Sequence, residues 1–167
     1  MKKLVDSLSD ENIGYVMRSI SVTRLPFPTP GQEHFEQVAY QVRVFRRHPA
    51  IRWQLRVFEQ IRPSVRLAGG TIRDTDIIIR HTGLDDAETI RQKAHRNLRL
   101  ALLQDAEWPD DPYNLMYIGE SLIYLGRLQE AVAYLEKSVA LFPPAASALG
   151  KAISLLSAAR HHLDYLP

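Results

Sequence analysis

The sequence predicts an α+β protein in which strands come first and a stack of helices follows. Up to about residue 82, apolar residues recur at every second position, which is typical of strands. After Gly83 the apolar period changes to 3.6 residues, which is typical of helices. We therefore expect a mixed sheet within residues 1–84, a linker helix within residues 85–110, and a helical hairpin with a capping helix within residues 111–167.

The first two predicted strands are separated by a proline-rich segment. In residues 38–46, alternate apolar side chains share one face, and residues 15–22 alternate more loosely. Residues 25–31 lie between them and contain three prolines, so we expect a loop there.

Two further strands are expected before the helices begin. Residues 51–58 are a third strand candidate and residues 71–79 a fourth, with a short helix over residues 60–67 that ends at Gly69 and Gly70. The unbroken apolar run at residues 77–79 predicts that the fourth strand is buried on both faces.

The helical part contains four predicted helices. Asp85 or Asp86 can cap the first, which runs to about Glu107, where Trp108 and Pro109 end it. The other three are expected at residues 112–125, 128–142 and 145–163.

Residues 111–143 show the spacing of a tetratricopeptide repeat, a helical hairpin of about 34 residues. Two antiparallel helices approach closely only where side chains are small, and they interlock where large side chains fill the gaps. The residues expected to pack the hairpin in this way are Leu115, Ile118, Gly119, Leu122, Gly126, Ala131, Leu135, Ser138 and Pro143. One repeat cannot bury its own faces, so we expect the preceding and following helices to cover them.

Composition excludes several classes of site. The chain has no cysteine, so disulfides, zinc sites with thiolate ligands and cysteine nucleophiles are excluded. No apolar run approaches the roughly 18 residues of a membrane span, and we expect a cytoplasmic protein without a membrane partner. Seven arginines lie between Arg43 and Arg66 against one acid, Glu59. An anion or nucleic-acid binder is therefore one alternative, which the net charge of only +2 supports weakly.

Two residues of the first part are candidates for site chemistry. Glu59 could act as a general base, although an ion pair with Arg56 or Arg62 is the plainer role. His81 follows an apolar strand and precedes a glycine turn, a position from which strands commonly present ligands, so it is the best single ligand candidate.

Three segments then suggest a family. Residues 43–53, 56–61 and 76–83, in this order, resemble the C-terminal part of family 2 glycosyltransferases of the GT-A type that carry tetratricopeptide repeats behind the catalytic domain. Residues 88–107 resemble the linker helix of those enzymes, and residues 110–115 resemble the start of their repeat.

The resemblance implies sugar transfer from a nucleotide-sugar with a divalent metal, Mn or Mg. In the resembling enzymes, the nucleotide-binding half and the metal motif precede the point that matches Met1, so we expect a partial GT-A-like sheet and no cofactor in this chain alone. Glu59 matches the acid of a His-Glu pair whose histidine is replaced here by Phe58, and is the implied catalytic residue. His81 matches a late histidine near the metal, a role possible only in an intact enzyme.

The expected function follows from this reading. The chain is interpreted as a truncated glycosyltransferase-like protein, inactive alone, that acts through its repeat as a module for binding a protein partner or for packing. One alternative is a glycosyltransferase that becomes active when a missing or separate N-terminal half is supplied. The arginine-rich binder of anions or nucleic acid is the other.

Overall fold

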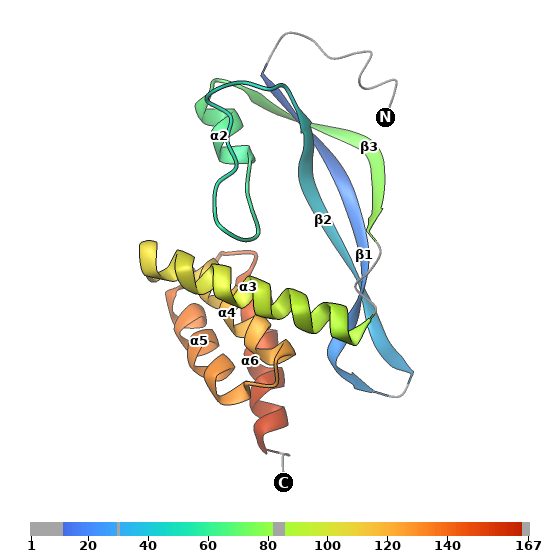
Figure 1. The fold of residues 1–167 in the computed structure, drawn as a ribbon, viewed down its shortest axis with the longest axis vertical. Helices are drawn as coiled ribbons and strands as arrows, with labels where there is room; N and C mark the ends of the chain where they lie inside the picture. The colour runs from blue at the N-terminus through green and yellow to red at the C-terminus, as the bar shows by residue number, and fades with distance from the viewer. Residues whose placement is uncertain (1–11, 30, 82–85, 165–167) are drawn as a thin grey trace. The chain divides into compact units, whose positions relative to one another are not determined.

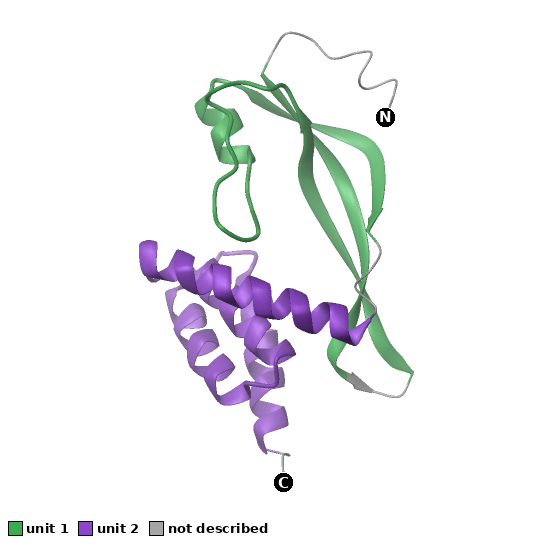
Figure 2. Ribbon diagram, in the orientation of Figure 1, with its two compact units in different colours: residues 1–85 green, residues 86–167 purple. Residues whose placement is uncertain are grey.

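The computed structural model describes residues 12–29, 31–81 and 86–164 (Figure 1). It is α+β, as predicted: a three-stranded mixed sheet is followed by a set of helices. The chain divides into two compact units, residues 1–85 and residues 86–167 (Figure 2). We call them the sheet unit and the helical unit.

The sheet consists of β1 (Ile13–Thr29), β2 (Gln32–Phe45) and β3 (Thr71–His81) in the order β2-β1-β3. β1 is antiparallel to β2 and parallel to β3. The first two strands form a long hairpin, and β3 returns after a connection that contains the short helix α2 (Arg62–Leu67).

The expected proline-rich loop over residues 25–31 is wrong in its extent. β1 continues to Thr29 and β2 begins at Gln32. Pro26 and Pro28 lie between the paired positions Arg24–His34 and Thr29–Gln32, where the register of the hairpin is irregular. Proline is tolerated at such a place because it has no N–H to donate to a regular ladder.

The strand predicted over residues 51–58 is also wrong. Only Gln54 pairs, through an isolated antiparallel bridge to Gln60 with N···O distances of 2.8 and 2.9 Å. Leu55 (φ 71°) and Phe58 (φ 54°) adopt left-handed backbone conformations, which an extended strand does not permit. This segment therefore folds back on itself, although its side chains alternate as in a strand.

The core of the sheet unit lies at one end of one sheet face. Val16 of β1 and Val42 of β2 pack with Ile51, Ile61 and Val65 from the connection that includes α2, and all five are buried. The Ser64 hydroxyl donates to the Arg52 carbonyl at 2.7 Å and accepts from the Arg52 N–H at 3.1 Å. These bonds fasten the irregular segment to the helix.

The prediction that residues 77–79 are buried on both faces is wrong. β3 is an edge strand, and the side chain of Ile78 is 49% exposed. The β1–β3 register shifts between Val16 and Arg18, and there the Thr75 hydroxyl donates to the Val16 carbonyl at 2.7 Å. An apolar run alone does not distinguish an edge strand from a central one, because the difference lies in which strands pair with it.

The helical unit contains α3 (Ala87–Glu107), α4 (Pro112–Tyr124), α5 (Leu128–Leu141) and α6 (Leu149–Asp164). The first three begin and end close to the predicted residues. α6 begins later than residue 145, because the chain first makes two turns closed by Ala146 N–H to Pro143 O (2.9 Å) and Leu149 N–H to Ala146 O (3.1 Å). None of the helices in the described residues is long and apolar enough to cross a membrane.

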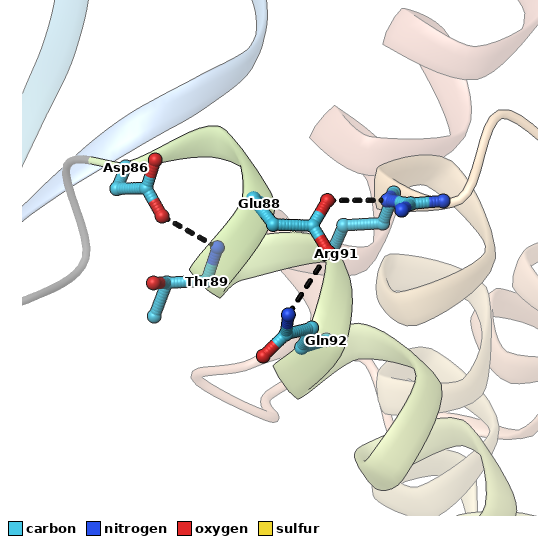
Figure 3. A network of polar contacts seen from close by, with 5 residues as sticks. All are labelled: Asp86, Glu88, Thr89, Arg91 and Gln92. Carbon is cyan, nitrogen blue, oxygen red and sulfur yellow. Dashed lines mark hydrogen bonds and ion pairs between the residues drawn. The ribbon is translucent and has the colours of Figure 1, made fainter.

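The start of α3 is fixed by its own side chains (Figure 3). The Asp86 carboxylate accepts a hydrogen bond of 2.7 Å from the Thr89 N–H, which satisfies one of the free donors of the first turn. Glu88 accepts from Arg91 and Gln92, each at 2.9 Å, and these bonds hold the pKa of Glu88 below its usual value. Asp86 is thus the cap; the other candidate, Asp85, lies outside the described residues.

Candidate functional site

The hairpin of α4 and α5 is organised around one close contact. Gly119 of α4 faces Leu135 of α5, and a Cβ placed on Gly119 would lie 2.5 Å from the Leu135 Cγ. Such a distance leaves no room for a side chain, so glycine permits the crossing. The large apolar residues predicted on either side of this contact, and the small residue Ala131 on α5, are all buried: Leu115, Ile118, Leu122, Ala131 and Leu135.

The predicted small and turn positions have different roles. Ser138 of α5 is fully buried, and its hydroxyl donates to the Pro112 carbonyl at the start of α4 at 2.8 Å. Gly126 has φ +73° in the turn between the helices, where a left-handed conformation suits glycine. Pro143 follows Phe142, the residue that ends α5.

Two neighbouring helices cover the hairpin. α3 packs on α4, and α6 packs on α5 with a smaller contact to α4. The buried residues of α3 include Ala94, Leu98 and Ala101, and those of α6 are Ala152, Leu156 and Ala159, so both covering faces follow the helical period. Sequence reasoning missed Asn114, whose side-chain amide is buried and donates to the Ala101 carbonyl of α3 at 3.0 Å.

A second feature missed from the sequence is an aromatic row on α4. Tyr113, Tyr117, Glu120 and Tyr124 follow one another at intervals of four, three and four residues, so they lie along one side of the helix. Lys151 of α6 lies 5.4 Å from the centre of the Tyr117 ring and 2.8 Å from a Glu120 carboxylate oxygen. We call these five residues the tyrosine face. The spacing of the tyrosines was visible in the sequence, but the contribution of Lys151 required the fold.

The tyrosine face is partly buried, and burial raises the pKa of two of its phenols. Burial raises the pKa of Tyr124 to about 12, and the neighbouring Glu120 carboxylate adds to the effect. Burial and Glu120 also raise the pKa of Tyr117. The phenols of Tyr117 and Tyr124 therefore remain neutral hydrogen-bonding groups at physiological pH. Tyr113 is 45% exposed and packs edge-on against Phe142, with ring centres 4.9 Å apart. Amphipathic rings with exposed edges are typical of surfaces that bind proteins.

The two residues predicted for site chemistry lie on different elements of the sheet unit. Glu59 is exposed on the segment between β2 and α2, next to the bridge residue Gln60. His81 is exposed at the last position of β3, where it pairs in register with Ser21 of β1. Within residues 12–29, 31–81 and 86–164, no three His, Asp or Glu side chains gather in a way that could hold a metal ion.

The arginines of the sheet unit are spread over several elements. Arg43 lies on β2 and donates to Gln41, whereas Arg52 donates to the Pro49 carbonyl at 3.1 Å and Arg62 to the Tyr40 carbonyl at 3.5 Å. These three side chains are thus engaged with groups of the sheet unit. The arrangement gives little support to one continuous anion-binding surface.

Comparison with known proteins leaves the family open. No protein-family model matches the chain, and a search of curated proteins returned no match.

Proposed function

We propose that this protein acts through its helical unit as a tetratricopeptide-like module that binds a protein partner. The observation that carries the proposal is the hairpin crossing at Gly119 and Leu135, where small and large residues recur at the spacing of such a repeat. The covering helices α3 and α6 support it, because a single repeat needs neighbours to bury its faces.

The binding surface in this proposal is the tyrosine face. Lys151 lies over the Tyr117 ring and Phe142 packs against the Tyr113 ring, so these two rings lose little side-chain freedom when a partner binds. A row of tyrosines beside a Lys–Glu pair suits a peptide segment that combines apolar side chains with hydrogen-bonding groups.

A photo-crosslinker placed at Tyr113 tests this function in cells that naturally express the protein. Leu103 of α3 is the matched control position, because its side chain is also 45% exposed. We expect one defined protein partner to crosslink from position 113, to be absent from position 103, and to be lost when Lys151→Glu is introduced. No partner from position 113, or the same set of proteins from both positions, would refute the proposal.

The sheet unit gives this proposal a family context. Its residues 43–53, 56–61 and 76–83 resemble the C-terminal part of family 2 glycosyltransferases that carry such repeats. In this proposal the chain alone transfers no sugar, and neither Glu59 nor His81 is given a catalytic role. The enzymatic alternative is that a separate chain supplies the nucleotide-binding half, and in that case the chain by itself should bind no nucleotide.

A further inference from the structure

The hairpin of β1 and β2 continues well beyond the core of the sheet unit. On the face that carries Val16 and Val42, three pairs of residues follow in regular register: Arg18 with Tyr40, Ile20 with Val38, and Val22 with Glu36. They share this face because successive side chains of a strand alternate between its two sides. We call these six residues the sheet patch.

Most of the apolar residues of the sheet patch are exposed. Tyr40 is 63% exposed, Val22 51% and Val38 46%, and Ile78 of β3, which lies beside Arg18, is 49% exposed. Contiguous apolar surfaces of this kind on a soluble protein mark interaction sites. Cross-strand neighbours on a sheet lie about 5 Å apart, so these side chains form one surface and are not isolated exposures.

The charges of the sheet patch lie at its two ends. Arg18 and Glu36 stand on opposite sides of the middle pair, Ile20 and Val38, and each is two residues away, or about 7 Å along the strands. The Nε atom of Arg18 is buried and has no hydrogen-bond partner among the described residues. Glu36 likewise has no ion pair in that part of the chain, and its side chain is exposed. Within the part of the chain that the structure describes, the Arg18 Nε thus lacks a hydrogen-bond acceptor and the Glu36 carboxylate lacks a cationic partner.

We infer that the sheet patch binds a second copy of this chain, face to face. A two-fold axis that crosses the strands at Ile20 and Val38 places the Glu36 end of each copy over the Arg18 end of the other. The apolar middle pairs with itself, and two Arg18–Glu36 ion pairs form by symmetry. Arg80, beside Ile20 on the outer strand, is at the rim, where its exposed side chain reaches solvent.

The self-complementary order of the patch selects this partner over an unrelated protein. Arg18 and Glu36 are equally far from the apolar pair Ile20 and Val38. When a second copy is reversed along the strands, each charge therefore faces an opposite charge and the apolar pair faces itself. Two sheets can pack through such faces with their strands aligned to within about 30°. This inference is independent of the function proposed for the helical unit.

Sedimentation equilibrium of the full chain, over a wide concentration range, tests it through charge reversal. We expect a monomer–dimer equilibrium whose association constant falls at least ~10-fold in Arg18→Glu and in Glu36→Arg, because each change sets two like-charge pairs across the interface. The double variant Arg18→Glu with Glu36→Arg restores opposite charges and is expected to return to within ~3-fold of the unmodified protein.

The control is Gln37→Arg, which adds a positive charge to the other face of β2. Its dimerisation is expected to match that of the unmodified chain, and circular dichroism of every variant checks the fold. A monomer at all concentrations overturns the inference, and so does a dimer that neither single reversal weakens. The inference is also overturned if the double variant does not regain association. Two changes that merely damaged the fold would not cancel each other, so recovery is expected only if Arg18 and Glu36 meet across the interface.

Discussion

The contact between Gly119 and Leu135 provides the most direct test of the helical packing. In Gly119→Ala, the added methyl would lie 2.5 Å from the Leu135 Cγ and 2.8 Å from its Cδ2. Leu135 is fully buried, so its side chain has little space into which it can move. We therefore expect this conservative change to destabilise the helical unit.

The magnitude results from two opposing effects. Forcing an extra methyl into a packed core costs about 1–3 kcal/mol, and two contacts below 3.0 Å place Gly119→Ala in the upper half of that range. Replacing glycine by alanine inside a helix contributes about 1 kcal/mol in the favourable direction. The net free energy of unfolding should fall by about 1–2 kcal/mol.

Urea denaturation followed by far-ultraviolet circular dichroism measures this change. Gly150 of α6 is the matched control. It is also a helical glycine, but a Cβ placed there meets no atom within 4 Å. Gly150→Ala should be neutral or stabilising, by up to about 1 kcal/mol. If Gly119→Ala stabilises the protein as much as Gly150→Ala does, the close contact of the two helices is not as described.

A double-mutant cycle separates the contact from the intrinsic preference for alanine. Leu135→Ala alone should cost about 2–5 kcal/mol, because it leaves a cavity in the hairpin. In that background Gly119→Ala no longer meets the leucine and should be neutral or stabilising by up to about 1 kcal/mol, which corresponds to a coupling free energy of about 1–3 kcal/mol. A coupling near zero would refute the reasoning.

Four further predictions concern other contacts. Ser138→Ala removes the hydrogen bond to the Pro112 carbonyl and should lower the free energy of unfolding by about 1 kcal/mol in urea denaturation. Asp86→Ala removes the cap on the Thr89 N–H and should cost about 1 kcal/mol in the same measurement. The pKa of Tyr124 is raised to about 12 in the folded state, so the stability that it contributes is present below pH ~10 and lost as the pH rises through 12, which a phenolate absorbance titration and unfolding at alkaline pH detect. By calorimetry, the purified chain should not bind a nucleoside diphosphate in the presence of manganese.

Each of these predictions has a control or a contrary outcome. For Ser138, the control is Ser154→Ala, whose exposed hydroxyl bonds only within its own helix, to the Gly150 carbonyl. An Asp86→Asn variant should keep most of the stability, because asparagine also caps helices. Tyr124→Phe should remove the late phenolate titration, and its persistence would assign it to another residue. Micromolar nucleotide binding would contradict the proposal that the chain alone lacks a donor site.

The helices were predicted well because their signals are local. Apolar spacing, the Asp86 cap and the Pro109 stop all lie within or beside the elements that they define. The crossing of α4 and α5 was also predicted, because Gly119 on one helix and Leu135 on the other have the spacing expected for such a hairpin. The late start of α6 was not, because the turns after Pro143 leave no periodic signal.

The strands were predicted less well because their structure depends on partners far away in the chain. Residues 51–58 alternate like a strand, but Gln54 pairs only with Gln60, six residues further along the chain. The apolar run at residues 77–79 predicted full burial, although β3 has one neighbouring strand among the described residues and the side chain of Ile78 is exposed. Alternation records which residues share a face, and it does not record whether anything covers that face.

The sequence by itself determined the α+β order of the chain, the approximate positions of α3 to α6 and the residues at the centre of the α4–α5 hairpin. Only the tertiary structure decided the length of β1, the place of β3 at the edge of the sheet, and the exposure of the sheet patch. It also brought Lys151 to the tyrosine face from a different helix. The physical reason is range: helical signals act over three or four residues, whereas strand pairing and surface composition join residues that are tens of positions apart.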